Sequence, residues 1–204
     1  MITRFDIDKA YQYLLILLAF LIPLTVFGAN LIIVIIVLLW ILSGNYKLKL
    51  YQIFNNKLMI ASIVFFAIHV IGLLWTEDKA WGLHIVHKMW YFLLLLPVLF
   101  TIVKKEYIKH YVHAFLFALL ITITLSYLIW FELMPPFKEA NVFDPTPFMS
   151  HVSYNPILLF GIYIMYHETM FNKNLTKLKI FFYCFVSIAM TFNMFITLGR
   201  AGQV

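Results

Sequence analysis

The sequence predicts an all-α fold, a polytopic integral membrane helix bundle with about seven transmembrane helices and an incomplete eighth. Of the 204 residues, 64% are hydrophobic and 12% are charged, whereas a globular domain is about half apolar and about a quarter charged. The apolar residues gather into stretches close to the length that a bilayer requires. The basic residues gather in alternate connecting segments, as they do in multi-pass membrane proteins.

The seven apolar stretches are predicted to form a single transmembrane domain over residues 1–204. They cover residues 11–27, 29–42, 57–75, 89–103, 111–133, 155–171 and 180–198. A tight turn at Gly28, Ala29 and Asn30 joins the first two, which could together form one helical hairpin. Two aspartates precede the first stretch and no small-residue cleavage site follows it early. We therefore expect this stretch to remain as an anchor rather than be removed as a signal peptide.

The placement of lysine and arginine predicts a cytoplasmic N-terminus. Eleven of the 15 basic residues then fall on inner segments, and only Lys79, Lys88, Lys138 and Arg200 fall outside. The outer loops are predicted at residues 76–88 and 134–154. The net charge of +6 thus reflects topology, and basic residues that share no face exclude a nucleic-acid-binding patch.

The first outer loop places Trp81 and two further apolar residues at helical spacing, which predicts a short amphipathic segment on the membrane surface. Trp81 and the other outer tryptophans either form an aromatic belt or stack on sugar rings, and Trp81 and Lys88 are candidate substrate-binding residues. His84 and His87 are either a hydrated surface pair or metal ligands. Because no third ligand stands at a matching spacing, we predict no metal site.

The second outer loop, with its border at residues 134–156, holds five of the seven prolines. Prolines exclude a helix and a central strand, so an extended, stiff loop is predicted. We expect its three phenylalanines, at positions 137, 143 and 148, to fold back over the bundle. His151 and Tyr154 mark the mouth of the next span, either as a polar helix entry or as contacts to a polar ligand, and both are candidate substrate-binding residues.

Arg200 follows a long apolar run and lies between two glycines, on the predicted outer side. It is either an anchor that snorkels to the interface or an anion site. The planar guanidinium matches two oxygens of a phosphate, and the small neighbours allow a ligand to approach closely. A lipid diphosphate is the predicted ligand of the anion site.

Three stretches resemble the N-terminal half of the O-antigen ligase family, which is related to the O-antigen polymerases. They are LLWTEDKAWGLHIVHKMWYFLLLLPVLF (73–100), SHVSYNPILL (150–159) and above all ITLGRAGQV (196–204). The arginine motif of the family reads as Thr or Ser, one or two residues, then Ser/Gly-Arg-Gly/Ala before a new apolar span. Thr197, Gly199, Arg200 and Ala201 match this motif.

The resemblance implies a bacterial inner-membrane enzyme of about a dozen spans, of which this chain would be an N-terminal fragment. Such enzymes transfer a glycan from undecaprenyl diphosphate to lipid A–core, or to another repeat unit, at the periplasmic face, without a metal or cofactor. Arg200 would be the catalytic and donor-binding residue that stabilises charge on the leaving diphosphate. A later periplasmic loop would supply a histidine, which is not His151, and a second arginine. Ligase and polymerase are not distinguished, and we expect donor binding at best from these residues alone.

Two other functions remain open. A transporter or flippase for a lipid-linked substrate would show paired half-repeats or broken helices. His69, the ionisable group deepest in an apolar stretch, is predicted to bond a neighbouring helix, and the lack of further ionisable groups at that depth counts against proton coupling. A membrane assembly protein without chemistry would leave Arg200 at the lipid headgroups, with no cleft beside it.

Overall fold

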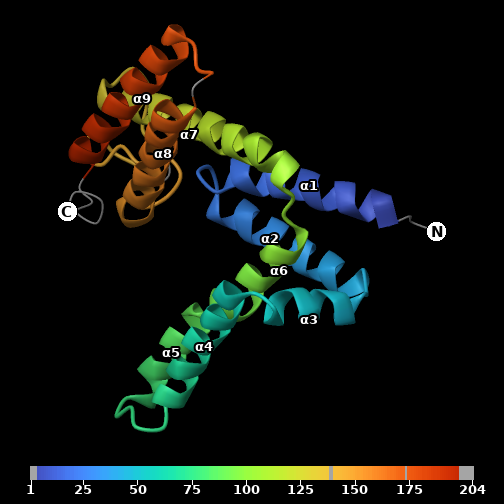
Figure 1. Ribbon diagram of the computed structural model, residues 1–204. Helices are drawn as coiled ribbons and strands as arrows, with labels where there is room; N and C mark the ends of the chain where they lie inside the picture. Colours follow the sequence, from blue (N-terminus) through green and yellow to red (C-terminus); the bar gives the residue numbers. More distant parts are fainter. Residues whose placement is uncertain (1–3, 138–139, 173, 198–204) are drawn as a thin grey trace. The chain divides into compact units, whose positions relative to one another are not determined.

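The computed structural model describes residues 4–137, 140–172 and 174–197, and within these ranges every regular element is helical (Figure 1). The extended pairing in this part of the chain is one isolated bridge between Asn141 and Asp144. The predicted all-α class is therefore confirmed for the described residues. The chain divides into two compact units, Met1–Leu15 with Leu31–Tyr107, and Ile16–Asn30 with Ile108–Val204. The single transmembrane domain stays a prediction.

Helices α1 (Arg4–Leu21) and α2 (Val26–Leu42) are separated by a turn at residues 22–25. The predicted turn at residues 28–30 is wrong. Pro23 explains the difference, because proline lacks the N–H that an α-helix uses and its ring clashes with the preceding turn. Gly28 and Asn30 lie inside α2 instead, where the Gly28 amide donates to the Thr25 hydroxyl at 3.2 Å.

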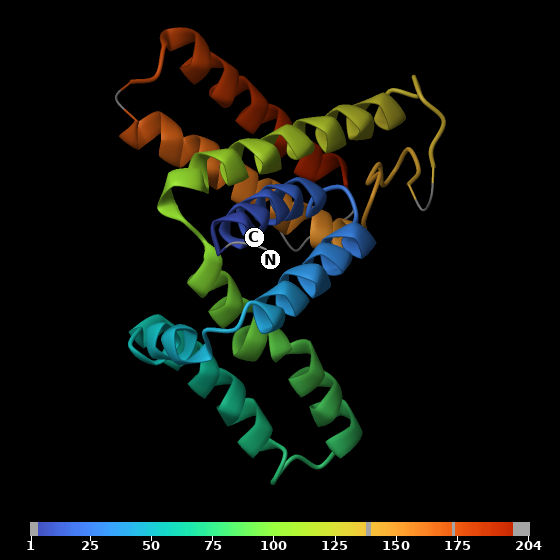
Figure 2. The same ribbon diagram turned by 90° about the vertical axis from the view of Figure 1, so that its right-hand side faces the viewer.

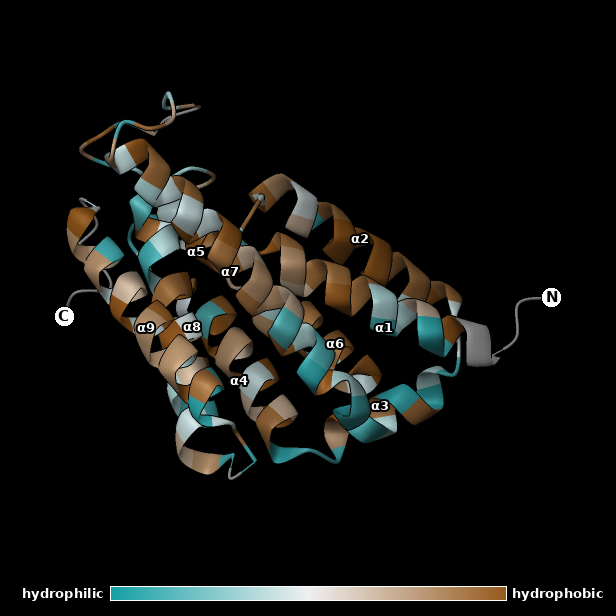
Figure 3. Cartoon of the chain, turned by 90° about the horizontal axis from the view of Figure 1, so that it is seen from above, coloured by the Kyte–Doolittle hydropathy of each residue, from teal (hydrophilic) through white to brown (hydrophobic). Residues whose placement is uncertain are grey.

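The predicted inner loop at residues 43–57 contains a further helix, α3 (Tyr46–Phe54), which is bent by 115° from α2. The bend falls at Gly44 and Asn45, whose φ angles are +62° and +55°. Glycine and asparagine are the residues that adopt this left-handed conformation most readily at a helix end. Figure 3 shows α2 in brown over most of its length, whereas α3 carries several teal, hydrophilic residues.

Helix α4 (Lys57–Gly72) begins at Asn56, whose side chain accepts hydrogen bonds from the amides of Leu58 and Met59. A short connection leads to a second helical run, whose start is capped by Asp78. This run consists of α5 (Lys79–Lys88), a π-helical turn η1 (Tyr91–Leu95) and α6 (Leu96–Ile102). The predicted loop at 76–88 is therefore mostly helical, and it extends the predicted span at 89–103 toward the N-terminus.

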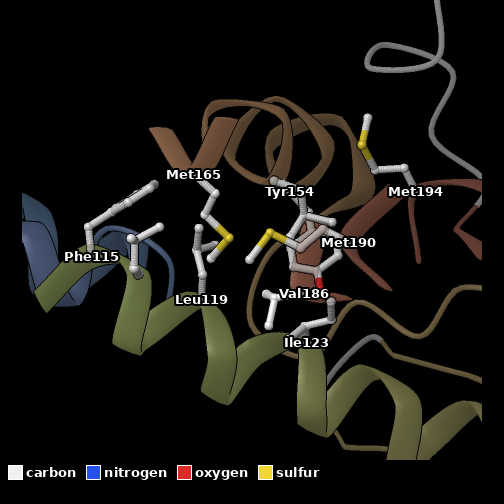
Figure 4. Packing of buried hydrophobic residues seen from close by; sticks show 10 residues of the cluster. Phe115, Leu119, Ile123, Tyr154, Met165, Val186, Met190 and Met194 are labelled. Carbon is white, nitrogen blue, oxygen red and sulfur yellow. The ribbon is translucent and has the colours of Figure 1, made fainter. Parts of the chain in front are cut away.

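The second unit contains α7 (Ile108–Trp130), which follows the short 3-10 turn η2 (Lys105–Tyr107), and then α8 (His151–Phe171) and α9 (Lys177–Ile196). Helices α8 and α9 pack along each other, and α7 packs against both (Figure 2). Their shared core is built from large side chains that are almost fully buried. Figure 4 shows Phe115, Leu119 and Ile123 along one face of α7, toward Met165 of α8 and Met190 of α9.

Among the residues that the structure describes, three helical runs are long and apolar enough to cross a bilayer: Lys79–Ile102, Lys105–Trp130 and Lys177–Ile196. The bent pair α2 and α3 would make a fourth if it counts as one span, and α4 is a shorter apolar helix. The structure thus supports three to four of the seven predicted spans, and the larger number stays a prediction.

Helix α9 shows the membrane character most clearly, because one of its faces exposes large apolar side chains at helical spacing. They are Leu178, Phe181, Phe185, Ile188, Phe192 and Phe195, each at least half exposed. Soluble monomers rarely expose an apolar surface of this kind, whereas lipid chains would cover it without cost.

Candidate functional site

The candidate site of the second unit is a group of buried polar side chains where α7, α8 and α9 meet. Ser126 of α7, Asn155 of α8 and Asn193 of α9 are completely buried, and Thr197, directly after α9, is 2% exposed. Polar groups are costly inside an apolar bundle and occur there mostly for helix association or function. We call these four residues, together with Tyr154, the polar cluster.

Two hydrogen bonds join residues of the polar cluster that lie on different parts of the chain. The Asn193 side-chain amide donates to the Ser126 hydroxyl at 2.8 Å, and thereby joins α9 to α7. The Thr197 hydroxyl lies 3.0 Å from Asn155 Oδ1 and 3.2 Å from the Met194 carbonyl. Thr197 is therefore fixed against the first turns of α8, although it lies just beyond the end of α9.

Two polar atoms of the cluster are buried without a hydrogen-bond partner among the described residues. They are the Tyr154 hydroxyl and Asn193 Oδ1. The Ser126 hydroxyl is close enough to influence that of Tyr154, but the two groups lack regular hydrogen-bond geometry. An unpaired buried polar atom costs about 1–3 kcal/mol, so the cluster retains a donor and an acceptor for a further group.

The loop before α8 forms a second polar feature one turn from the cluster. His151 Nδ1 lies 2.8 Å from Asp144 Oδ2, and we assign the proton to the ring nitrogen because an ionised carboxylate only accepts. The Asn141 side chain accepts the amides of Phe143 and Asp144 at 2.9 Å, which orders the turn that presents Asp144. A cavity of about 560 Å³ lies against this loop and includes both His151 and Asp144 in its lining.

The predicted site residues occupy different surroundings. His151 and Tyr154 lie on consecutive turns of α8, one at the cavity and the other in the polar cluster. Arg200 lies outside the described residues. Trp81 and Lys88 belong to the first unit, where both are exposed at opposite ends of α5, and the Trp81 ring centroid lies 5.5 Å from that of His84.

Two further expectations are wrong in detail. Phe137 and Phe148 do pack on each other, with ring centroids 5.8 Å apart, but Phe143 is 80% exposed. His69 Nδ1 bonds the Phe65 carbonyl of its own helix at 2.8 Å rather than a neighbouring helix. An i−4 carbonyl is always within reach of a helical side chain, so this partner forms without any tertiary contact.

Sequence reasoning missed Ser126 and Asn193, which form the centre of the polar cluster. Each is a single polar residue inside an apolar stretch, so neither belongs to a recognisable spacing. The available signal was Asn193 itself, since an asparagine in the last third of an apolar span indicates a bond to another helix.

Comparison of the chain with family models, with curated proteins and with solved structures finds no match.

Proposed function

We propose that the chain acts in membrane glycan transfer of the O-antigen ligase type. The glycan would pass from undecaprenyl diphosphate to lipid A–core, or to another repeat unit, at the periplasmic face of the bacterial inner membrane. The membrane character of the described helices supports the setting of this proposal. The proposed reaction is supported by the arginine motif and by the residues that contact its first member.

One observation supports the proposal most directly: the first residue of the arginine motif is held in place by the second unit. Thr197, the first motif residue, is buried and bonded to Asn155. Asn155 follows His151 by one turn of α8, so Thr197 lies at the end of the unit that carries the Asp144–His151 loop. Arg200 comes three residues later, and three residues of extended chain span at most about 11 Å.

In the proposed reaction an acceptor hydroxyl attacks the anomeric carbon of the donor glycan. The bond from that carbon to the diphosphate oxygen breaks, the hydroxyl proton is released to water, and the undecaprenyl diphosphate leaves with the added negative charge. A guanidinium stabilises that charge through two parallel N–H···O bonds. The Asp144–His151 pair and its cavity are the proposed contact for the polar part of a substrate, and Trp81 and Lys88 remain candidate substrate-binding residues.

The test compares three variants of a full-length version of the protein, with all the spans that the resemblance implies, expressed in cells that make O-antigen. We expect Arg200→Ala to lower glycan transfer by about 10²–10³ and Arg200→Lys to restore little of it, since an ammonium lacks the two-pronged match to phosphate. Arg4→Ala removes the only other arginine of the chain and is the matched control. The readout is attached O-antigen on lipopolysaccharide gels, normalised to membrane protein level. Normal laddering in the alanine variant would contradict the proposal.

A transporter or flippase of a lipid-linked substrate is the second candidate, and the bend between α2 and α3 favours it. Helices broken near a left-handed Gly44–Asn45 pair resemble the discontinuous helices of transporters. The two functions separate in a vesicle assay. A flippase moves a fluorescent undecaprenyl-linked glycan across the bilayer without acceptor, whereas a transferase consumes it only when the acceptor is present.

A further inference from the structure

A cavity of about 350 Å³ lies within the first unit, between the start of α1, helix α3 and the end of α6. One part of its lining is apolar and includes Ile7 and Leu48. The other part is polar and includes Ser43, Lys49 and Lys104. A site of this composition accepts a group that is polar at one end and apolar at the other.

Lys49 is the distinctive member of the lining, because its ammonium is held by neutral groups. Its Nζ donates to the Trp40 carbonyl at 2.6 Å and to the Ser43 hydroxyl at 2.7 Å, and lies 4.4 Å from the centroid of the Trp40 ring. Within the described ranges no carboxylate lies at ion-pair distance from Lys49. Lys104, in contrast, pairs with Asp8 at 2.8 Å.

The surrounding hydrogen bonds fix the position of this ammonium. Ser43 donates to the Trp40 carbonyl at 2.9 Å, so the Tyr11 hydroxyl, 2.8 Å away, donates to Ser43. The Ser43 hydroxyl therefore accepts hydrogen bonds from both Tyr11 and Lys49, which uses both of its lone pairs. As a neutral group it cannot neutralise the positive charge of the Lys49 ammonium. Burial lowers the pKa of Lys49 from its ordinary value, as expected for a desolvated cation without a counter-ion.

We propose that this cavity binds the phosphate group of an anionic glycerophospholipid, with Lys49 as the residue that neutralises it. A partly buried cation is stabilised by an anion with which it shares hydrogen bonds, and the third N–H of Lys49 has no acceptor among the described residues. The apolar part of the lining suits the beginning of the acyl chains. Trp40 and Tyr46, with ring centroids 6.2 Å apart, are residue types typical of headgroup depth.

The predicted topology places this cavity at the cytoplasmic leaflet, where anionic lipids attract basic residues. Residues 43–57 and 104–110 are both inner segments in that topology, and they supply Lys49 and Lys104. Lipid binding at this cavity involves neither Arg200 nor the polar cluster and is therefore independent of glycan transfer.

The experiment measures binding of phosphatidylglycerol to the purified full chain in neutral detergent, by native mass spectrometry. Lys49→Met keeps the length of the side chain and removes the charge. Lys47→Met is the matched control, because Lys47 lies two residues earlier on α3 and is exposed. We expect Lys49→Met to weaken the affinity by about five- to tenfold, the effect of one basic residue at the membrane surface when it is partly desolvated. The control should change it by less than about twofold.

Ser43→Asp gives a second arm that leaves both lysines in place. The new carboxylate would pair with Lys49 from within the chain, and we expect the same loss of phosphatidylglycerol binding even if Lys49→Met does not fold. Equal affinities in Lys49→Met and Lys47→Met, or an unchanged affinity in Ser43→Asp, would overturn the proposal. Displacement of the lipid by millimolar inorganic phosphate would also overturn the lipid assignment and show that the ligand is a free phosphate.

Discussion

Helix α8 approaches α7 at Gly161, and replacement of this glycine by alanine tests the packing of the second unit. A Cβ atom at Gly161 would lie 2.4 Å from Leu119 Cδ1, with Met190 Sδ and Cε at 3.5 and 3.7 Å. Carbon atoms normally meet at about 3.5–4.0 Å, so the new methyl group is too close to Leu119 by about 1 Å. Leu119 and Met190 are completely buried and have little room to move.

The magnitude follows from two opposed effects. Overpacking in a filled core costs about 1–3 kcal/mol, while alanine favours a helix over glycine by about 1 kcal/mol. Gly161→Ala should therefore destabilise the protein by about 0–2 kcal/mol. At Gly72, the last residue of α4, an added Cβ meets no atom within 4 Å. Gly72→Ala gains the same helix preference without a clash and should stabilise by about 1 kcal/mol, so the two variants should differ by the cost of overpacking, about 1–3 kcal/mol.

The free energy of unfolding is measured in mixed micelles of a mild detergent and dodecyl sulfate, followed by tryptophan fluorescence. The double variant Leu119→Ala with Gly161→Ala completes a mutant cycle. Removal of Leu119 Cδ1 should abolish the clash, which gives a favourable coupling of at least about 0.5 kcal/mol. Equal effects of the two glycine substitutions, or a coupling of zero, would refute the close approach of α8 to α7 at this position.

Two further predictions concern α9 and the topology. Asn193→Leu should change the free energy of unfolding by less than about 1 kcal/mol, because two effects oppose each other. It removes one hydrogen bond, worth about 0.6 kcal/mol on average between membrane helices, and it also removes one unpaired buried oxygen. A loss above about 2 kcal/mol would mean that the cluster is bonded more extensively than described. In a Cys184→Ser background, Lys105→Cys should resist a membrane-impermeant thiol reagent in intact cells and react after lysis. Labelling of this cysteine in intact cells would contradict the predicted cytoplasmic position of residue 105.

The apolar stretches predicted the positions of most helices. A helix that contacts lipid or the protein core along its whole length consists mostly of apolar residues, so a run of such residues in the sequence marks its position. Helices α2, α4 and α7 begin and end within three residues of the predicted spans. The turn between α1 and α2 lies at residues 22–25 and not at Gly28, the residue from which the sequence predicts it. Within an apolar helix a glycine is tolerated, and Pro23 is the residue that removes a backbone hydrogen bond.

The short helices could not be predicted in the same way. Helix α3 mixes polar and apolar residues and is only nine residues long, so composition does not separate it from a loop. Its direction relative to α2 depends on the backbone angles of Gly44 and Asn45, and the composition of the flanking stretches does not determine these angles. In the candidate site, Tyr154 and His151 were identifiable as polar residues at the mouth of a span. The bond from Asn193 to Ser126 joins residues 67 positions apart and depends on how the helices pack.

The π-helical turn at Tyr91–Leu95 lies within the helical run from Lys79 to Ile102. Such a turn holds one residue more than a regular turn, so loss of a single residue here would leave a regular turn, and Trp81 and Lys88 would nearly keep their angular position relative to Val98. Loss of a residue from a regular turn of the same run would instead rotate them by about 100°, because each residue advances an α-helix by that angle. The π turn is thus a position in the first unit where the chain could shorten by one residue while the surfaces on either side of it stay aligned.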